Sequence, residues 1–291
     1  MPHFRIPASG ADSSQGTPIP RSSTSITNLE NGNRRIVQNL GRFSILEYER
    51  DLGVAPDNAE AEYFMSQMNV RRRQVVIAVD GSSPVVTQAG AMQWFAGSVD
   101  LTTGIKGVGD LLGKSIRGAV TKESAIKPEY VGTGTLVLEP TRKYIILEDV
   151  TTWGQQGMVI EDGMFLACDG TISQKIVARS NASSAIAGGE GLFNLALAGS
   201  GVAALESNVP REELIEIDLC NETLKIDGHM AVMWSASLDF TVERSSKTLI
   251  GSAYSGEGLV NVYRGTGKVL MSPVASTFSQ FSASHNASPK H

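Results

Sequence analysis

Three short glycine motifs recur along the chain at a nearly constant interval. Each reads Gly-x-Gly and precedes an apolar run, and the first glycines are Gly132, Gly199 and Gly265, which lie 67 and 66 positions apart. A second motif, Gly-Glu-Gly at 189–191 and 256–258, repeats at the same interval. Fixed-period self-similarity is the sequence signature of internal repeats, whose units pack side by side and share a core. We therefore predict that one unit of about 66 residues occurs three times.

Each predicted unit has the pattern of strands and tight turns. Leu238, Phe240 and Val242 alternate with polar residues, which is the period of a strand with one buried face. Asp-Gly pairs, which favour tight hairpins because both central positions need positive φ, separate such runs. The chain also has 30 glycines and only 19% charged residues, a composition that favours many short strands. We predict an all-β protein with one or two short helices.

The repeat markers divide the 291 residues into segments. A polar segment rich in Ser, Pro and Thr precedes the repeats, and a similar polar tail follows them. The predicted boundaries are a disordered leader 1–35, a lead-in with a short helix 36–70, repeats 71–139, 140–206 and 207–273, and a disordered tail 274–291. The first repeat contains a Gly- and Lys-containing insertion at 104–120.

Two stretches have the spacing of amphipathic helices. The first follows Pro56, where Asp57 and Glu60 resemble a capping box. Apolar residues then recur over 61–68 at the i, i+3, i+4, i+7 spacing of one helix face. The second stretch covers 108–119, inside the insertion of the first repeat.

Several of these segments resemble the altered-inheritance-of-mitochondria family of TRAP-like β-proteins, named after the trp RNA-binding attenuation protein. The resemblance covers about residues 43–273 and is carried by Ala61 through Met68, Gly90 through Trp94, Gly189 through Asn194 and Gly256 through Gly267. It implies three TRAP-like units of β-sandwich or double-stranded β-helix architecture in one chain. It also implies a link with mitochondrial organisation in eukaryotic members. It supplies no set of catalytic residues.

The most tempting site is a glycine-rich stretch at 107–115. It ends in Gly113-Lys114-Ser115 like a phosphate-binding P-loop, but the glycine that the motif requires at 108 is Val108. We expect a flexible hinge that leads into a short helix rather than a nucleotide site. Alternatively, Lys106, Lys114 and Arg117 could contact an anionic lipid or a partner while neighbouring apolar residues dock. These three are the candidate binding residues.

Catalytic and metal-binding patterns are sparse. Of the four histidines only His229 lies within the predicted repeats, too few for a histidine-rich metal centre, although carboxylates could hold a hard cation. Cys168 follows an apolar run, which favours a buried thiol. The sequence contains no Gly-x-Ser-x-Gly nucleophile elbow and no Ser/His/Asp order of a catalytic triad. We predict no catalytic residues, no metal and no cofactor.

Charge argues against nucleic acid as the main partner. The formal net charge is −5, and the one basic run is 71–73, which we interpret as a solvated strand edge that deters strand addition. The two cysteines suggest no disulfide framework and therefore a reducing compartment. The leader lacks a secretory apolar core. We expect a cytoplasmic protein, or a mitochondrial one if its source is eukaryotic.

The sequence thus favours a non-enzymatic intracellular β-protein that acts through protein or membrane-surface contacts, as a homo-oligomer. Flat repeated β-units are suited to symmetric assembly. The alternative is a regulatory protein that binds RNA or a small ligand, by analogy with the attenuation protein, which is an argument from fold alone.

Overall fold

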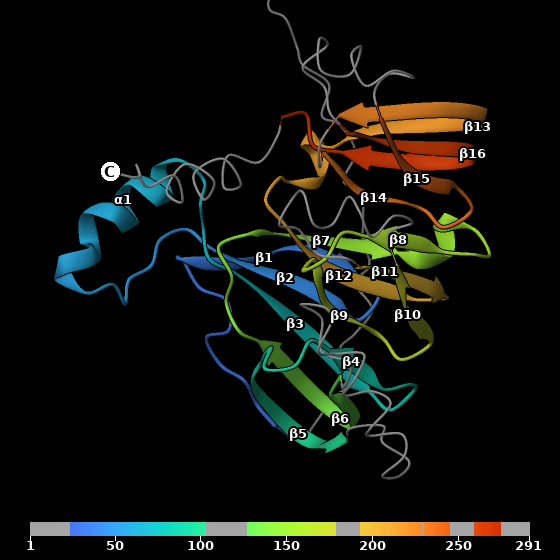
Figure 1. Cartoon of the computed structure of the whole chain (residues 1–291). Helices are drawn as coiled ribbons and strands as arrows, with labels where there is room; N and C mark the ends of the chain where they lie inside the picture. Colours follow the sequence, from blue (N-terminus) through green and yellow to red (C-terminus); the bar gives the residue numbers. More distant parts are fainter. Residues whose placement is uncertain (1–23, 103–126, 179–192, 228–229, 245–258, 275–291) are drawn as a thin grey trace, which may run out of the picture.

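The computed structural model describes residues 24–102, 127–178, 193–227, 230–244 and 259–274. Nearly all of its regular structure is β, in two antiparallel sheets (Figure 1). The predicted all-β class is confirmed. None of the described helices is both long and apolar enough to cross a membrane.

The larger sheet has nine strands. Its neighbours in order are β1 (Arg34–Leu40), β2 (Phe43–Tyr48), β3 (Arg73–Asp80), β6 (Glu129–Leu138), β4 (Val85–Thr87), β9 (Phe165–Asp169), β12 (Val202–Ser207) and β7 (Tyr144–Asp149). The remaining strand, β5 (Met92–Thr102), pairs with β6.

The smaller sheet has seven strands. Its order is β10 (Ile172–Ala178), β11 (Phe193–Gly199), β8 (Met158–Ile160), β14 (Ala231–Ser235), β16 (Leu259–Met271) and β13 (Ile215–Asp227). The seventh strand, β15 (Asp239–Arg244), also pairs with β16. Three short 3-10 turns connect strands: η1 (Pro56–Asn58), η2 (Val150–Trp153) and η3 (Arg211–Glu213).

The hydrophobic core between the two sheets is built from alternate residues of facing strands. Phe165 and Leu205 of the larger sheet belong to the same buried cluster as Met158, Leu197 and Met233 of the smaller one. Two further clusters lie on the other faces, one around Phe43, Ile77 and Leu136 in the larger sheet and one around Trp234 and Tyr263 in the smaller sheet. Each sheet is therefore buried on part of both faces.

Strands of the three predicted repeats lie in three successive zones. Figure 1 shows β3–β6 at one end, β7–β12 in the middle and β13–β16 at the other end. Each zone contains a pair of adjacent strands joined by a connection outside the described residues: β5 with β6, β10 with β11, and β15 with β16. The arrangement follows the predicted order of the repeats, while their mutual similarity stays a prediction.

The segment before the first repeat is more structured than the sequence indicated. Two paired strands, β1 and β2, occupy most of 34–48, and β2 continues the larger sheet by pairing with β3 through Phe43 and Ile77. The predicted leader boundary at residue 35 is therefore wrong, because β1 begins at Arg34.

The first predicted helix is confirmed as η1 followed by α1 (Ala59–Gln67). The helix begins without the capping box: Asn58 is its N-cap residue, and no side-chain hydrogen bond caps it. The second predicted helix, at 108–119, lies outside the described residues.

Candidate functional site

The candidate binding residues from the sequence, Lys106, Lys114 and Arg117, lie outside the described residues, as does His229. Four other features of the described chain offer candidate sites: the basic run, a buried arginine, helix α1 and a groove in the smaller sheet. Within the described ranges, no three His, Cys, Asp or Glu side chains come together as a metal-binding group.

The basic run 71–73 is not a solvated edge, so that interpretation was wrong. Arg73 is buried in β3, an interior strand, where its guanidinium contacts the Tyr144 ring at 4.2 Å. Glu47 forms ion pairs with both Arg73 and Arg71, at 2.8 and 3.1 Å. The third arginine of the run, Arg72, pairs with Asp51. Because carboxylates already neutralise all three cations, the run is a poor phosphate-binding surface.

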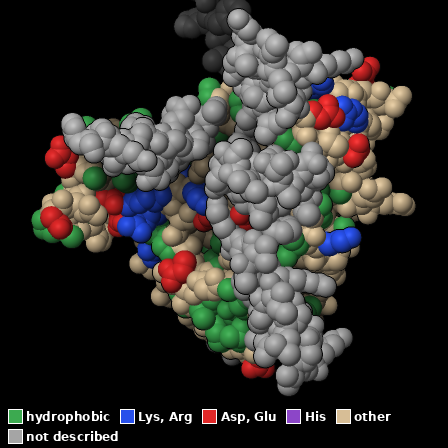
Figure 2. Space-filling model, in the orientation of Figure 1, with side chains coloured by type: hydrophobic (Ala, Val, Ile, Leu, Met, Phe, Trp, Pro, Cys, Tyr) green, Lys and Arg blue, Asp and Glu red, His purple; other side chains and the backbone are tan. Residues whose placement is uncertain are grey.

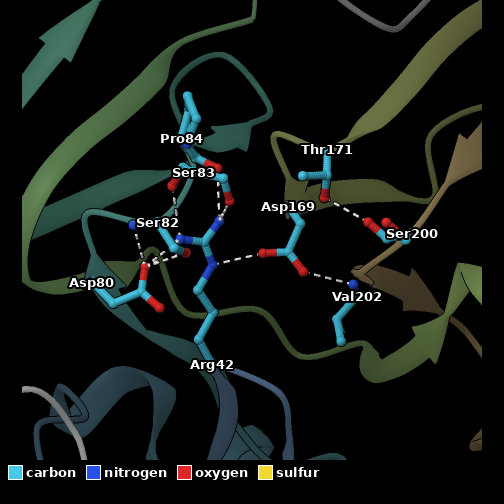
Figure 3. A network of polar contacts seen from close by, with 9 residues as sticks. All are labelled: Arg42, Asp80, Ser82, Ser83, Pro84, Asp169, Thr171, Ser200 and Val202. Atoms are coloured by element: carbon cyan, nitrogen blue, oxygen red, sulfur yellow. Dashed lines mark hydrogen bonds and ion pairs between the residues drawn. The ribbon is translucent and has the colours of Figure 1, made fainter.

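A buried polar network centres on Arg42, at the turn between β1 and β2 (Figure 3). The side chain is only 9% exposed, and its Nε donates to Asp169 at 2.6 Å. Its terminal nitrogens donate to the Ser83 and Pro84 carbonyls at 2.8 and 2.7 Å and lie 3.3 Å from Asp80. One guanidinium thus ties together three segments that are far apart in the chain.

The two carboxylates of the network are themselves well bonded. Asp169 also accepts the Val202 backbone N–H at 2.7 Å. Burial opposes ionisation of Asp80, but hydrogen bonds from Ser82 and the charge of Arg42 outweigh it, so the pKa of Asp80 lies below its usual value. With these partners satisfied, the network has the features of a structural clamp, not of a reactive centre.

Helix α1 projects from the side of the molecule without a buried residue (Figure 1). Its aromatic side chains are exposed, Tyr63 at 61% and Phe64 at 56%, and so is the C-cap residue Met68 at 76%. The helix is held to the body by polar contacts, because Glu62 pairs with Arg142 and the Ser66 hydroxyl donates to the Glu49 carbonyl at 3.1 Å. The apolar side chains of this amphipathic helix therefore do not pack against the described core of the chain.

A groove of about 370 Å³ crosses the smaller sheet. Strand pairing places four of its residues in one row across the sheet. Lys175 of β10 is opposite Ala196 of β11. Val159 of β8 follows opposite Ala196, and Trp234 of β14 ends the row opposite Val159. Small side chains in the middle of the row and long ones at its ends leave the hollow. The other lining residues are Gln156, Ser173, Val177, Asn194, Ala198, Ala236, Leu238 and Phe240.

The far wall of the groove is aromatic. Trp234 lies 5.3 Å from Phe240 between ring centroids and 5.3 Å from Tyr263, and Phe240 and Tyr263 are 5.1 Å apart. The Trp234 indole is almost fully buried in this cluster. A rigid aromatic wall beside small alanine side chains is typical of a site that holds an apolar group.

Comparison with known proteins places the chain in a family. The family model described as "Mitochondrial biogenesis AIM24" matches residues 66–274. The chain belongs to this family. The family resemblance seen in the sequence is thus confirmed, whereas a triplicated TRAP-like unit stays a prediction.

Two relatives of this AIM24-family protein come from the bacterium Streptococcus pyogenes. One, from serotype M6, has the name "uncharacterized protein" and is 31% identical over 203 residues, which are 67% of this chain and 79% of the relative. The other is a crystal structure with 27% identity and a TM-score of 0.52, covering 74% of this chain and 92% of that one. The groove residues all lie inside the segment that the AIM24 family matches, whereas α1 begins before it.

Cys168 is a buried thiol, as the sequence predicted, and is not a reactive one. Burial and the neighbouring charge of Asp169 raise its pKa to about 12. Cys220 is exposed. Because only the thiolate attacks thiol reagents, we expect Ellman's reagent at pH 8 to modify one thiol per native chain quickly and the second only after unfolding in guanidinium chloride. Equal rates for both thiols in the native protein would contradict this.

Proposed function

We propose that this AIM24-family protein is a non-enzymatic contact protein that assembles with further copies of itself through α1. The observation that carries the proposal is the absence of any buried residue in α1, although the helix presents Tyr63, Phe64 and Met65 and its C-cap residue Met68 is also exposed. Tyr, Phe and Met are enriched in protein–protein interfaces. An exposed apolar patch of this kind marks an interaction surface in a soluble protein.

The charge of α1 favours a protein partner over a membrane. The helix contains no Lys or Arg and has Glu60 and Glu62 in its first turn. Helices that lie on membranes have basic polar faces that meet anionic lipids. Figure 2 shows hydrophobic and acidic side chains together on the projecting helix, whereas a membrane-bound helix would combine hydrophobic with basic side chains.

A second copy of the chain supplies matching chemistry. It offers the same aromatic and methionine surface, and self-complementary pairing about a two-fold axis is the commonest form of oligomer. Arg50 follows Glu49, whose carbonyl binds Ser66 of the helix; it is exposed, and no ion pair involves it in the described part of the chain. It provides a positive charge that Glu60 of another copy can meet.

Mass measurement tests this proposal. We expect the native protein to be oligomeric at micromolar concentration in sedimentation equilibrium. The double variant Phe64→Ser, Met68→Ser should associate about a hundredfold more weakly, because each apolar side chain buried in an interface contributes roughly 1.5–3 kcal/mol. Neither side chain is buried in the monomer, so folding should be unaffected. The matched control is Leu101→Ser, which removes an exposed apolar side chain from β5.

Two results would overturn the proposal. One is a native protein that is monomeric at all concentrations, and the other is a double variant that associates as tightly as the native protein. A monomer that floats with anionic vesicles, and loses this property in the double variant, would replace the second copy by a membrane as the partner of α1.

We further propose that the three zones of strands are copies of one TRAP-like unit. Backbone geometry supports this at the repeated glycines. The first glycine of each Gly-x-Gly has positive φ, +115° at Gly132, +128° at Gly199 and +118° at Gly265. In the first two repeats, a Cβ at this position would meet the carbonyl oxygen of Ser98 or Thr171 at 2.0 or 2.5 Å. Superposition of the three zones in an experimental structure is the direct test.

A further inference from the structure

The groove in the smaller sheet is lined by hydrogen-bond donors that have no partner in the described part of the chain. Asn194 is 5% exposed and Trp234 is 3% exposed, and both line the groove. Neither the Asn194 amide nor the Trp234 indole N–H has a hydrogen-bond partner in the described ranges, whereas the indole of Trp153 donates to Glu148 at 3.2 Å. Neither group belongs to the fully enclosed polar atoms that lack a partner, so both stay accessible to solvent or to a ligand in the groove.

A third donor, Lys175, lies at the end of the row opposite to Trp234. Lys175 is exposed at the edge of the groove, and no carboxylate of the described chain pairs with it. Asn194 is opposite Val177, which lies two residues after Lys175 on the same face of β10. Asn194 is therefore a diagonal neighbour of Lys175, with roughly 7–8 Å between their Cα atoms. No Asp or Glu is among the residues that line this groove. Lys175 is therefore the one charged side chain among the described residues that line the groove, and its positive charge favours an oxyanion.

The middle of the row and the residues beside Trp234 are mainly apolar. From Lys175 to Trp234 the row crosses three strand spacings, about 14 Å in total. Between them lie Ala196 and Val159, with Ala236, Leu238 and Phe240 beside Trp234. The groove thus has a cationic end and a long apolar end that finishes at an aromatic wall.

We propose that this groove binds an amphipathic oxyanion, a molecule with a carboxylate or phosphate end and a linear or aromatic apolar body. Lys175 and the Asn194 amide bind the oxyanion, and the apolar body lies over Ala196 and Val159 against Trp234. This inference does not depend on assembly through α1, because no groove residue belongs to that helix.

Fluorescence titration with anilinonaphthalene sulfonate, an aromatic sulfonate, tests the proposal. We expect the probe to bind the native full-length protein and to be displaced by decanoate or decyl phosphate, but not by decanol, which has the same chain without a charge. Displacement by decanoate alone or by decyl phosphate alone identifies the oxyanion as a carboxylate or a phosphate. Equal displacement by decanol and by the anions would overturn the oxyanion assignment.

Two variants locate the binding site. Lys175→Gln should weaken binding of the displacing anion at least about tenfold, as expected for a lost charged hydrogen bond. The matched control is Lys225→Gln, an exposed lysine on β13 outside the groove, which should leave binding unchanged. Equal affinities for the two variants would overturn the proposal.

Asn194→Leu separates a binding role from a structural one. An amide that supports the fold through hydrogen bonds destabilises the protein when it is replaced, whereas an unpaired buried amide does not. We expect Asn194→Leu to keep the native midpoint of chemical denaturation and to bind decanoate or decyl phosphate at least about tenfold more weakly. A lowered midpoint with unchanged binding would assign Asn194 to the fold and overturn its place in the site.

Discussion

Replacing Arg42 with alanine should lower the free energy of unfolding by about 3–5 kcal/mol, because removing one partner of a buried ion pair leaves the other charge without compensation. Asp169 is the charge left behind: its side chain is 15% exposed and would keep only the Val202 N–H. The Ser83 carbonyl would also lose its Arg42 donor, whereas the Pro84 carbonyl would keep the Gly170 N–H at 2.8 Å. Chemical denaturation followed by circular dichroism measures the loss.

Two control variants separate the causes of this loss. Arg42→Lys keeps the positive charge but not the planar fork of donors, so we expect a smaller loss than in Arg42→Ala. Arg264→Ala removes the arginine of a half-exposed pair with Glu243, at 2.7 Å, and should cost at most about 1 kcal/mol. If Arg42→Ala were no more destabilising than Arg264→Ala, the network would not be a structural clamp.

The Arg42 network also shows where sequence reasoning stops. Arg42 and Asp169 are 127 residues apart, and no spacing rule links them. Their approach depends on the neighbouring positions of β4 and β9 in the larger sheet, where Val85 is opposite Asp169. Strands β1 and β2 were missed for a similar reason, since what fixes β2 as a strand is its pairing with β3.

Helix α1 was predictable as a helix but not as an exposed one. The spacing of apolar residues in 61–68 defines a face, and the face alone does not say what covers it. The groove left no signal in the sequence at all. Its hollow arises because Ala196 and Ala198 come into line with Lys175 and Trp234 through strand register, and alanines in strands are unremarkable one at a time.

The bacterial relatives bear on function. A streptococcus has no mitochondria, so whatever chemistry the AIM24 fold shares with them cannot depend on that organelle. The groove lies within the segment that matches the family, whereas most of α1 precedes it. The groove proposed to bind a ligand thus lies in the matched β-body, and the helix proposed to mediate assembly lies mostly before the matched segment.

Gly132→Ala should destabilise the protein by more than about 4 kcal/mol, a loss found only where a substitution breaks the packing of the fold. The new Cβ would lie 2.0 Å from the Ser98 carbonyl oxygen, a distance that backbone cannot tolerate. Gly132 is opposite Val99 in the ladder of β5 and β6, so the two strands would have to separate there. The backbone at Gly132 also has φ +115°, a conformation that favours glycine.

The first glycine of the third Gly-x-Gly motif distinguishes backbone strain from the steric clash. Gly265 has nearly the same φ, +118°, yet the nearest atoms to a Cβ there are 3.9 Å away. Gly265→Ala therefore carries backbone strain without a clash, and we expect a loss of about 1–3 kcal/mol. The difference in unfolding free energy between the two variants, measured by chemical denaturation, is the contribution of close strand approach at Gly132. Equal losses would mean that strain alone selects glycine at both positions, and that β5 and β6 can part at Gly132 without cost.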